Sequence, residues 1–275
     1  MAQKGFTING RKVDYDQAVG LAREGQLSYP PALLRAMFSN RTNTIPSPSV
    51  LSGGCLRSFY LKLDTDEYPT PESLLMAMVG TGIHFLLEHH TEKEDGTPEL
   101  KMSVQFHFPE LNPPWDKPTL SGTSDLIQIA GETVVDYKTK AGKKLVAEGD
   151  NILDPKHITQ VEYYAAMLWK SEGIELKYYD ICYIARDIDY DYDKQRMKDP
   201  YLVAAARFVG DLRPLPVIWD ELTAKIRGYC ESLSAGETPK VHSDYLVSKL
   251  KGRAEGNCFL CGVKDKCKKL YHEGR

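Results

Sequence analysis

The pattern of apolar and polar positions centres on two β-prone runs, residues 126–129 and 133–137, on either side of Ala130-Gly131. Two such runs around a short turn containing glycine predict a β-hairpin. A turn centred on these two residues sets Asp125 opposite Asp136, with Cβ atoms about 5 Å apart. Lys138 lies two residues beyond Asp136 and therefore on the same face of the strand. The pattern thus predicts that two carboxylates and one ammonium group converge.

Helical periodicity and helix-terminating residues predict the elements around this hairpin. A helix is expected at residues 16–24, another at 31–38, a turn into a helix at 49–63, and longer helices at 71–91, 155–173 and 219–233. One strand is expected to end at Phe108, and the mostly apolar run 176–185 is typical of a strand buried on both faces. Gly80 and Gly82, inside the helix at 71–91, indicate close packing against its backbone. Loops are expected at 143–154 and 187–200, together with a loop-rich, basic tail.

A chain of 275 residues with 42% hydrophobic and 27% charged residues suits one large domain with an appendage. We expect residues 1–45 to be an N-terminal appendage and residues 46–275 to form the main domain, with the polar stretch 39–49 as a linker. The first ten residues lack an apolar signal core, and the most apolar stretch, 74–87, is too short to span a bilayer. These features predict a cytoplasmic protein that has no contact with a membrane.

The net charge of −3 argues against a uniformly basic nucleic-acid-binding surface. The charge is unevenly distributed, because residues 240–275 carry nine Lys and Arg against four Asp and Glu. Such a basic segment on an acidic body can attract phosphates.

The cysteines include a C-x₂-C-x₅-C cluster formed by Cys258, Cys261 and Cys267, and Cys55 far upstream is the natural fourth ligand. Four thiolates suit either tetrahedral Zn²⁺ or an iron–sulfur cluster, and the spacing does not decide between them. Cys182 and Cys230 lack ligand spacing and are expected to be buried thiols.

Further polar residues lie near the hairpin in the predicted fold. Gln160 and Tyr164 are one turn apart on the helix that follows it, and His84 lies in the helix at 71–91. Each alone is more typical of a structural or surface residue. Two adjacent carboxylates, however, are costly without a cation between them, and oxygen ligands favour Mg²⁺ or Mn²⁺.

Taken together, these motifs resemble the RecB-like branch of the PD-(D/E)XK nucleases. The resemblance rests on His84 in Gly-Thr-Gly-Ile-His, on Gly122-Thr-Ser-Asp125, on Asp136-Tyr-Lys138 and on Gln160-Val-Glu-Tyr-Tyr164, within residues 49–270. The four cysteines resemble those of its iron–sulfur members, which include the CRISPR-associated fourth-family exonucleases and the AddB nuclease domain.

The resemblance implies an α/β fold of the restriction-endonuclease type, in which helices flank a central mixed sheet and an iron–sulfur-clipped part joins the N- and C-terminal regions. It implies that His84, Asp125, Asp136 and the backbone carbonyl of Tyr137 bind Mg²⁺ or Mn²⁺. Lys138 would position or deprotonate the attacking water, and Gln160 and Tyr164 would orient the lysine or the nucleic acid. The four implied ligands of a structural [4Fe–4S] cluster, with Zn²⁺ as the alternative, are Cys55, Cys258, Cys261 and Cys267.

The expected function is that of a divalent-metal-dependent deoxyribonuclease, most simply an exonuclease on single-stranded DNA ends. The alternatives are a non-catalytic DNA-binding or recombination accessory protein that keeps the fold as a scaffold, and a zinc-stapled nuclease. Partner proteins would come from a recombination, repair, phage or CRISPR-adaptation system. Candidate phosphate contacts are Arg57, Lys249, Lys251, Arg253, Lys264, Lys268 and Lys269. Candidate rings for stacking on unpaired bases are Phe59, Tyr60, Tyr163 and Tyr164.

Overall fold

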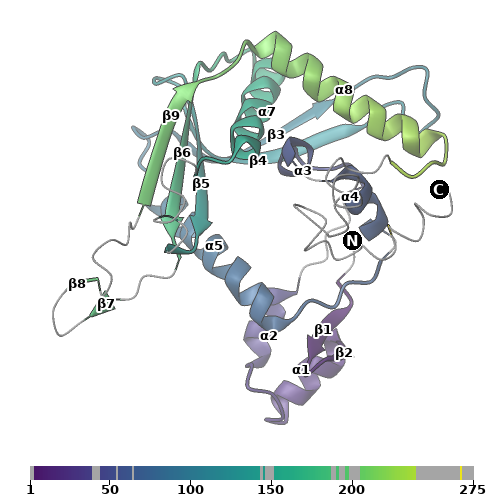
Figure 1. The fold of residues 1–275 in the computed structure, drawn as a ribbon, viewed down its shortest axis with the longest axis vertical. Helices are drawn as coiled ribbons and strands as arrows, with labels where there is room; N and C mark the ends of the chain where they lie inside the picture. The colour runs from purple at the N-terminus through teal and green to yellow at the C-terminus, as the bar shows by residue number, and fades with distance from the viewer. Residues whose placement is uncertain are drawn as a thin grey trace, which may run out of the picture. The chain divides into compact units, whose positions relative to one another are not determined.

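The chain forms two compact units in a computed structural model, which describes residues 3–38, 44–53, 55–63, 65–142, 145, 152–186, 190–191, 196–197, 205–239 and 267 (Figure 1). The N-terminal unit comprises residues 1–46, 54–79 and 232–275, and the sheet unit comprises residues 47–53 and 80–231. Residues 54–79 therefore belong to the same unit as residues 1–45, the expected appendage, so the division between the two units does not fall at a single point near residue 45.

The sheet unit is built on a five-stranded mixed sheet with the order β3-β4-β5-β6-β9. Its strands are β3 (Thr97–Gln105), β4 (Thr119–Gln128), β5 (Thr133–Lys140), β6 (Tyr178–Ala185) and β9 (Ala205–Asp211). Strands β5 and β6 are parallel, and all other neighbours are antiparallel. The sheet is flanked by α7 (Pro155–Glu172), with α3 (Pro48–Gly53) packed beside α7, and by α8 (Leu215–Ser234), which confirms the expected α/β class.

The hairpin register predicted from the sequence is confirmed. Leu126 pairs with Val135 and Gln128 with Thr133. The turn residue Glu132 has a φ of 50°. Val134 and Val135 are buried, as an apolar run in a central strand requires. The hairpin therefore delivers Asp125 and Asp136 to the same end of the strand pair.

Helix α7 makes the crossover between the parallel strands β5 and β6, because parallel neighbours need a long connection. It begins at Pro155, where the side chain of the N-cap Asp154 accepts the Lys156 N–H at 3.1 Å. It ends at Gly173, whose φ of 71° permits a left-handed cap. All residues from Gln160 to Leu168 are buried, so this helix is held firmly against the sheet.

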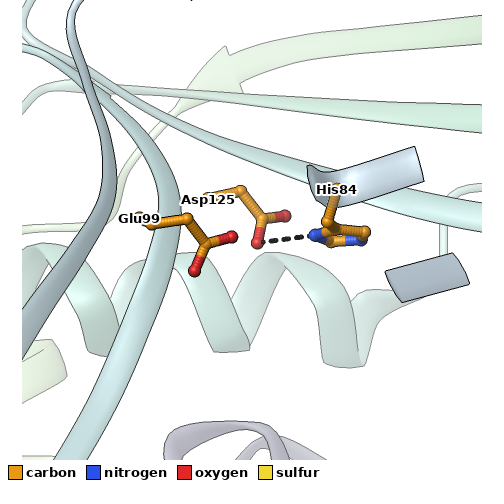
Figure 2. A group of neighbouring side chains, drawn as sticks. All are labelled: His84, Glu99 and Asp125. Atoms are coloured by element: carbon orange, nitrogen blue, oxygen red, sulfur yellow. Dashed lines mark hydrogen bonds and ion pairs between the residues drawn. The ribbon is translucent and has the colours of Figure 1, made fainter. Parts of the chain in front are cut away.

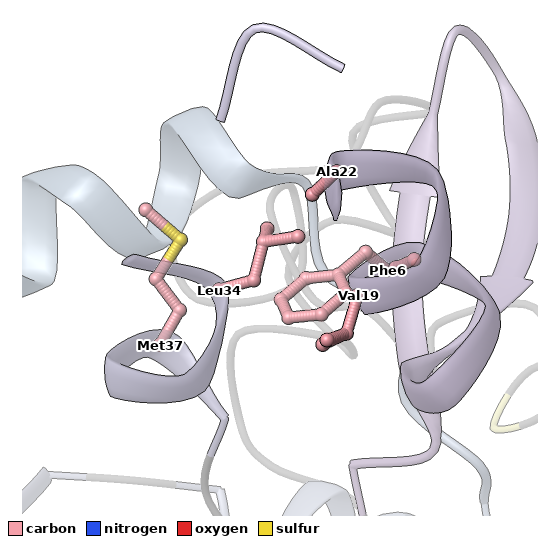
Figure 3. Packing of buried hydrophobic residues seen from close by; sticks show 6 residues of the cluster. Phe6, Val19, Ala22, Leu34 and Met37 are labelled. Atoms are coloured by element: carbon pink, nitrogen blue, oxygen red, sulfur yellow. The ribbon is translucent and has the colours of Figure 1, made fainter. Parts of the chain in front are cut away.

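The N-terminal unit has a small hydrophobic core of its own. Strands β1 (Gly5–Ile8) and β2 (Arg11–Asp14) form a hairpin around Asn9-Gly10, both with positive φ, and helices α1 (Tyr15–Arg23) and α2 (Pro31–Met37) follow. Figure 3 shows the core at close range, and its buried members are Phe6, Ala18, Val19, Ala22, Leu34 and Met37. Leu74, Leu75 and Met78, from the first turns of α5 (Pro71–His90), pack against this core. The rest of α5, from Gly80 onward, belongs to the sheet unit.

Several boundaries differ from the sequence prediction. The region 49–63 forms two helices, α3 and α4 (Leu56–Leu63), and strand β9 was not predicted. Helix α8 begins four residues earlier than expected because Pro216 is tolerated in a first helical turn. The expected loop 187–200 contains the short ladder of β7 (Tyr190–Asp191) and β8 (Arg196–Met197).

No helix in the described ranges is both long enough and apolar enough to cross a membrane.

Candidate active site

The candidate site lies in the sheet unit where β4 and β5 separate. The β4–β5 ladder ends at Leu126–Val135, one step before Asp125 and Asp136. On the other side of β4, the β3–β4 ladder pairs Pro98 with Leu126 and Leu100 with Ser124 but skips Asp125. Asp125 is therefore the point at which both neighbouring ladders are interrupted.

The carboxylate of Asp125 contacts a backbone amide and an imidazole. Its Oδ2 accepts the backbone N–H of Tyr137 at 2.6 Å, and its Oδ1 lies 3.1 Å from Nδ1 of His84. The hydrogen bond to Asp125 raises the pKa of His84, so the carboxylate stabilises the charged form of the imidazole. The sequence prediction that His84 of α5 reaches the hairpin is thus matched by direct contact.

Asp136 is almost fully buried, with 1% of its surface exposed. Burial raises the pKa of its carboxyl to about 6, although the neighbouring Lys138 charge opposes this shift. The Lys138 ammonium lies 2.9 Å from both carboxylate oxygens, as expected for residues two apart on one strand face. The pair places a positive charge beside the second carboxylate of the site.

Helix α7 supports Asp136 from the opposite side. The Gln160 amide Nε2 lies 3.4 Å from Asp136 Oδ1 and 3.2 Å from the Tyr164 hydroxyl oxygen, to both of which it donates. Tyr164 is possible in this position because Gly122 leaves room for its ring: a Cβ at Gly122 would lie 2.8 Å from Tyr164 Cε1 and 2.9 Å from Pro48 Cγ. The Gly122 and Asp125 positions of one motif therefore serve packing and chemistry, respectively.

The structure adds an acidic residue that the sequence analysis missed. Glu99, on β3, has an oxygen that lies within 4.8 Å of a ring nitrogen of His84 and a carboxylate oxygen of Asp125, and these three atoms are all within that distance of one another. Figure 2 shows the carboxylate of Glu99 beside that of Asp125, with His84 on the other side of Asp125. Only the β3–β4 register brings Glu99 here, and no motif in the sequence indicated that register.

Close packing of α5 against β5 explains one of its two glycines. A Cβ at Gly80 would lie 3.2 Å from Thr139 Oγ1, whereas a Cβ at Gly82 would meet no described atom within 4 Å. The expectation of close packing is therefore right for Gly80 and wrong for Gly82.

Several predicted residues are placed differently from the expectation. Tyr163 and Tyr164 are 0% and 5% exposed, so neither ring offers an open face for stacking on a base. Arg57 is 3% exposed and donates from Nη1 to the Pro239 carbonyl at 3.1 Å, within the N-terminal unit. That burial leaves Arg57 little surface with which to contact a phosphate.

The cysteines are only partly described. Cys230 is buried as predicted, but Cys182 is half-exposed because it lies on the sheet face opposite α7, paired with Tyr137 and Arg207. Cys55 and Cys267 are both partly exposed, and the Sγ of Cys55 accepts the Ser58 N–H at 3.4 Å. The remaining cluster positions, Cys258 and Cys261, lie outside the described residues, as do the candidate phosphate contacts Lys249, Lys251, Arg253, Lys264, Lys268 and Lys269.

Comparison with solved structures finds distant similarity. A protein named SSO0001 is 12% identical, with a TM-score of 0.44 over 84% of this chain and 89% of that one. A phage-related exonuclease from Haemophilus somnus 129PT is 13% identical, with a TM-score of 0.34 over 57% and 73% of the two chains. A protein described as a putative exonuclease from Eubacterium rectale is 12% identical, with a TM-score of 0.34 over 82% and 80%.

No curated protein matches the chain. The family model of the PD-(D/E)XK nuclease superfamily, in contrast, matches residues 78–268 and so includes every residue of the candidate site. Since this match spans well over half of the sequence, the chain belongs to the PD-(D/E)XK nuclease superfamily.

Proposed function

We propose that this protein is a divalent-metal-dependent deoxyribonuclease that hydrolyses phosphodiester bonds as an exonuclease on single-stranded DNA ends. The observation that carries the proposal concerns Asp125, in contact with His84, and Asp136, in contact with Lys138. Both lie directly beyond the end of the β4–β5 ladder, where burial and the nearby charge of Asp125 both raise the pKa of Asp136. A buried carboxylate with a raised pKa is costly in a scaffold, and such groups gather at functional sites.

The chemistry of the donor set supports a hard divalent ion. His84, Asp125, Asp136 and the backbone carbonyl of Tyr137 would hold Mg²⁺ or Mn²⁺, which prefer carboxylate and carbonyl oxygens. When bound, the ion supplies a water of lowered pKa and polarises a phosphoryl oxygen.

The chain's own residues orient and complement the phosphate. As an ammonium, Lys138 would add positive charge where negative charge grows in the transition state and would position the attacking water. As a neutral amine, it would instead take the proton of that water. Gln160 of α7 donates to the Asp136 carboxylate and to the Tyr164 hydroxyl, so that Tyr164 orients Gln160 and Gln160 positions Asp136 beside Lys138. Asp125 fixes the orientation of the His84 ring through Nδ1.

We further propose that Cys55, Cys258, Cys261 and Cys267 bind a structural [4Fe–4S] cluster, with Zn²⁺ as the competing occupant. Support comes from the C-x₂-C-x₅-C spacing and from the assignment of Cys55 and Cys267 to the same N-terminal unit. Anaerobic purification distinguishes the two: stoichiometric iron and a brown colour support the cluster, and a colourless protein with stoichiometric zinc overturns it.

The proposed biological setting is cytoplasmic, with DNA as the substrate and with partner proteins of a recombination, repair, phage or CRISPR-adaptation system. The basic segment 240–275 supports contact with DNA phosphates. In this proposal residues 46–275 act as the nuclease domain, and residues 1–45 remain an appendage.

A set of three single-stranded oligonucleotides tests the activity: 5′-labelled, 3′-labelled and circular, each with Mg²⁺ and with Mn²⁺. Stepwise shortening of the linear strands, resistance of the circle and loss of activity in Asp136→Asn support an exonuclease. Cleavage of the circular strand would instead identify the protein as an endonuclease. DNA binding without any cleavage would support the accessory-protein alternative.

A further inference from the structure

Glu99 is a charged residue of the sheet unit that the family motifs do not include. It lies on β3 between Pro98 and Leu100, which pair with Leu126 and Ser124 of β4. This register sets Glu99 opposite Asp125, although the two are not themselves paired. Both residues therefore lie where the ladder opens, and their side chains are free to turn toward each other.

The local backbone is unusual for a glutamate. Glu99 has a φ of 47°, in the left-handed region that costs a non-glycine residue about 1–2 kcal/mol. Asn and Asp tolerate this region better than Glu does. Stability alone would therefore favour a different residue at this position.

Burial and the negative charges of Asp125 and Glu88 raise the pKa of the Glu99 carboxyl, although the charges of His84 and Lys101 oppose the shift. Within the described part of the chain it has no hydrogen-bond or ion-pair partner, yet one of its oxygens lies within 4.8 Å of ligand atoms of both His84 and Asp125. Two carboxylates at this separation repel each other unless a positive charge lies between them. A divalent cation relieves the repulsion and can bind one oxygen of each carboxylate.

We propose that Glu99 is an additional ligand of the divalent ion, which it binds together with His84 and Asp125. The inference rests on the proposed function and extends its ligand set beyond the family motifs by one carboxylate from β3. The imidazole of His84 favours Mn²⁺ over Mg²⁺, because nitrogen donors favour the transition metal, whereas both ions accept carboxylate oxygens such as those of Glu99. Glu99 thereby adds to the affinity of the site for either divalent ion.

The competing explanation is that Glu99 acts only through its charge, and Glu88 provides the matched control. Glu88 is an exposed residue of α5, one turn beyond His84, and its charge is near enough to raise the pKa of Glu99. It is not among the residues whose ligand atoms converge on the site. Glu88→Gln thus removes one nearby negative charge and no ligand.

The test is calorimetric and EPR titration of Mn²⁺ into the full chain, from which divalent ions have been removed by chelation, without DNA. We expect Glu99→Gln to weaken Mn²⁺ binding about 10-fold or more, and to weaken Mg²⁺ binding as well. We expect Glu88→Gln to change the Mn²⁺ affinity less than about 3-fold. Equal effects of the two variants would overturn the assignment of Glu99 as a ligand.

Asp125→Asn separates this inference from the proposed function. If Asp125→Asn abolishes Mn²⁺ binding and Glu99→Gln leaves it unchanged, only the inference about Glu99 fails. If Asp125→Asn also binds Mn²⁺ like the wild type, the metal site of the proposed function fails as well. Glu99→Asn provides a check on folding, because asparagine tolerates the positive φ at this position. Without metal, the melting temperature of this variant should equal or exceed that of the wild type, and the variant should bind Mn²⁺ more weakly. A lower melting temperature together with unchanged Mn²⁺ affinity would assign Glu99 a purely structural role.

Discussion

Gly122→Ala is the substitution through which the packing of the site can be tested most directly. The new methyl group would lie 2.8 Å from Tyr164 Cε1 and 2.9 Å from Pro48 Cγ. Carbon atoms in contact are normally roughly 3.5–4.0 Å apart, so the new methyl group and these atoms must separate by about 0.6–1.2 Å through movement of Tyr164, Pro48 or strand β4. Overpacking of this kind costs about 1–3 kcal/mol in the free energy of unfolding.

The displacement is expected to reach the reacting groups. The Gln160 amide donates to the Tyr164 hydroxyl at 3.2 Å and to the Asp136 carboxylate at 3.4 Å. The second distance is already at the limit of a hydrogen bond. A shift of even half an ångström at Tyr164 therefore frees Asp136 from α7. Misplacement of about 1 Å near a reacting centre can cost about 100-fold in rate, and we expect a loss of this order for Gly122→Ala.

Urea unfolding and Mn²⁺-dependent cleavage of a labelled oligonucleotide measure the two effects separately. Gly82→Ala is the matched control, because its methyl group meets no described atom within 4 Å and lies inside helix α5. It should increase stability by about 0.5–1 kcal/mol. If Gly122→Ala showed wild-type stability and wild-type cleavage, the close approach of Tyr164, Pro48 and β4 would be refuted. A stability loss with full activity would refute only the connection from Tyr164 to Asp136.

Three further predictions concern charged groups. Lys138→Ala should reduce turnover at least about 100-fold while changing the Mn²⁺ affinity only a few-fold, and full activity in the cleavage assay would contradict its role. Arg213→Ala removes the guanidinium that lies 2.7 Å from the Glu162 carboxylate, a residue that is only 2% exposed. Urea unfolding should show that the free energy of unfolding decreases by about 3 kcal/mol, whereas replacement of both residues by apolar ones should decrease it far less. Burial lowers the pKa of His157 to about 4, below its value in the unfolded chain. Between about pH 6.5 and pH 4 only the unfolded state therefore takes up a proton as the pH falls. The free energy of unfolding should decrease over this window, by about 1–2 kcal/mol given the partial exposure of the ring. His157→Gln should show a shallower pH dependence of the melting temperature; an identical slope would mean that other groups cause it.

Local sequence patterns were sufficient for the hairpin and for the residues that it carries. Asp125, Asp136 and Lys138 are placed by the short turn at residues 129–132 and by the alternation of side chains along a strand, both of which act over a few residues. Gln160 and Tyr164 follow from helical spacing in the same way, and the contact of Gln160 with Asp136 agrees with the expectation that the helix after the hairpin packs beside it. The match of the family model agrees with these motifs, because each is a compact group of neighbouring residues.

Long-range packing decided what the local patterns left open. Tyr163 and Tyr164 could have been exposed stacking platforms, but the firm seating of α7 on the sheet buries both rings. Arg57 carries the guanidinium group of a typical phosphate contact. The N-terminal unit, however, buries this side chain, which donates to the Pro239 carbonyl. Strand β9 depends on pairing with β6, so its own alternating pattern was not enough to predict it.

By itself, the sequence determined the hairpin register, the principal acidic and basic residues of the site and the helix that supports them. Only the tertiary structure brought Glu99 beside Asp125, because a register between β3 and β4 depends on contacts across a connection of many residues and not on a turn signal. It also decided that the first turns of α5 complete the N-terminal core while later turns carry His84. Burial and register are collective properties of the packed chain, whereas a turn or a helical face is encoded in a few consecutive residues.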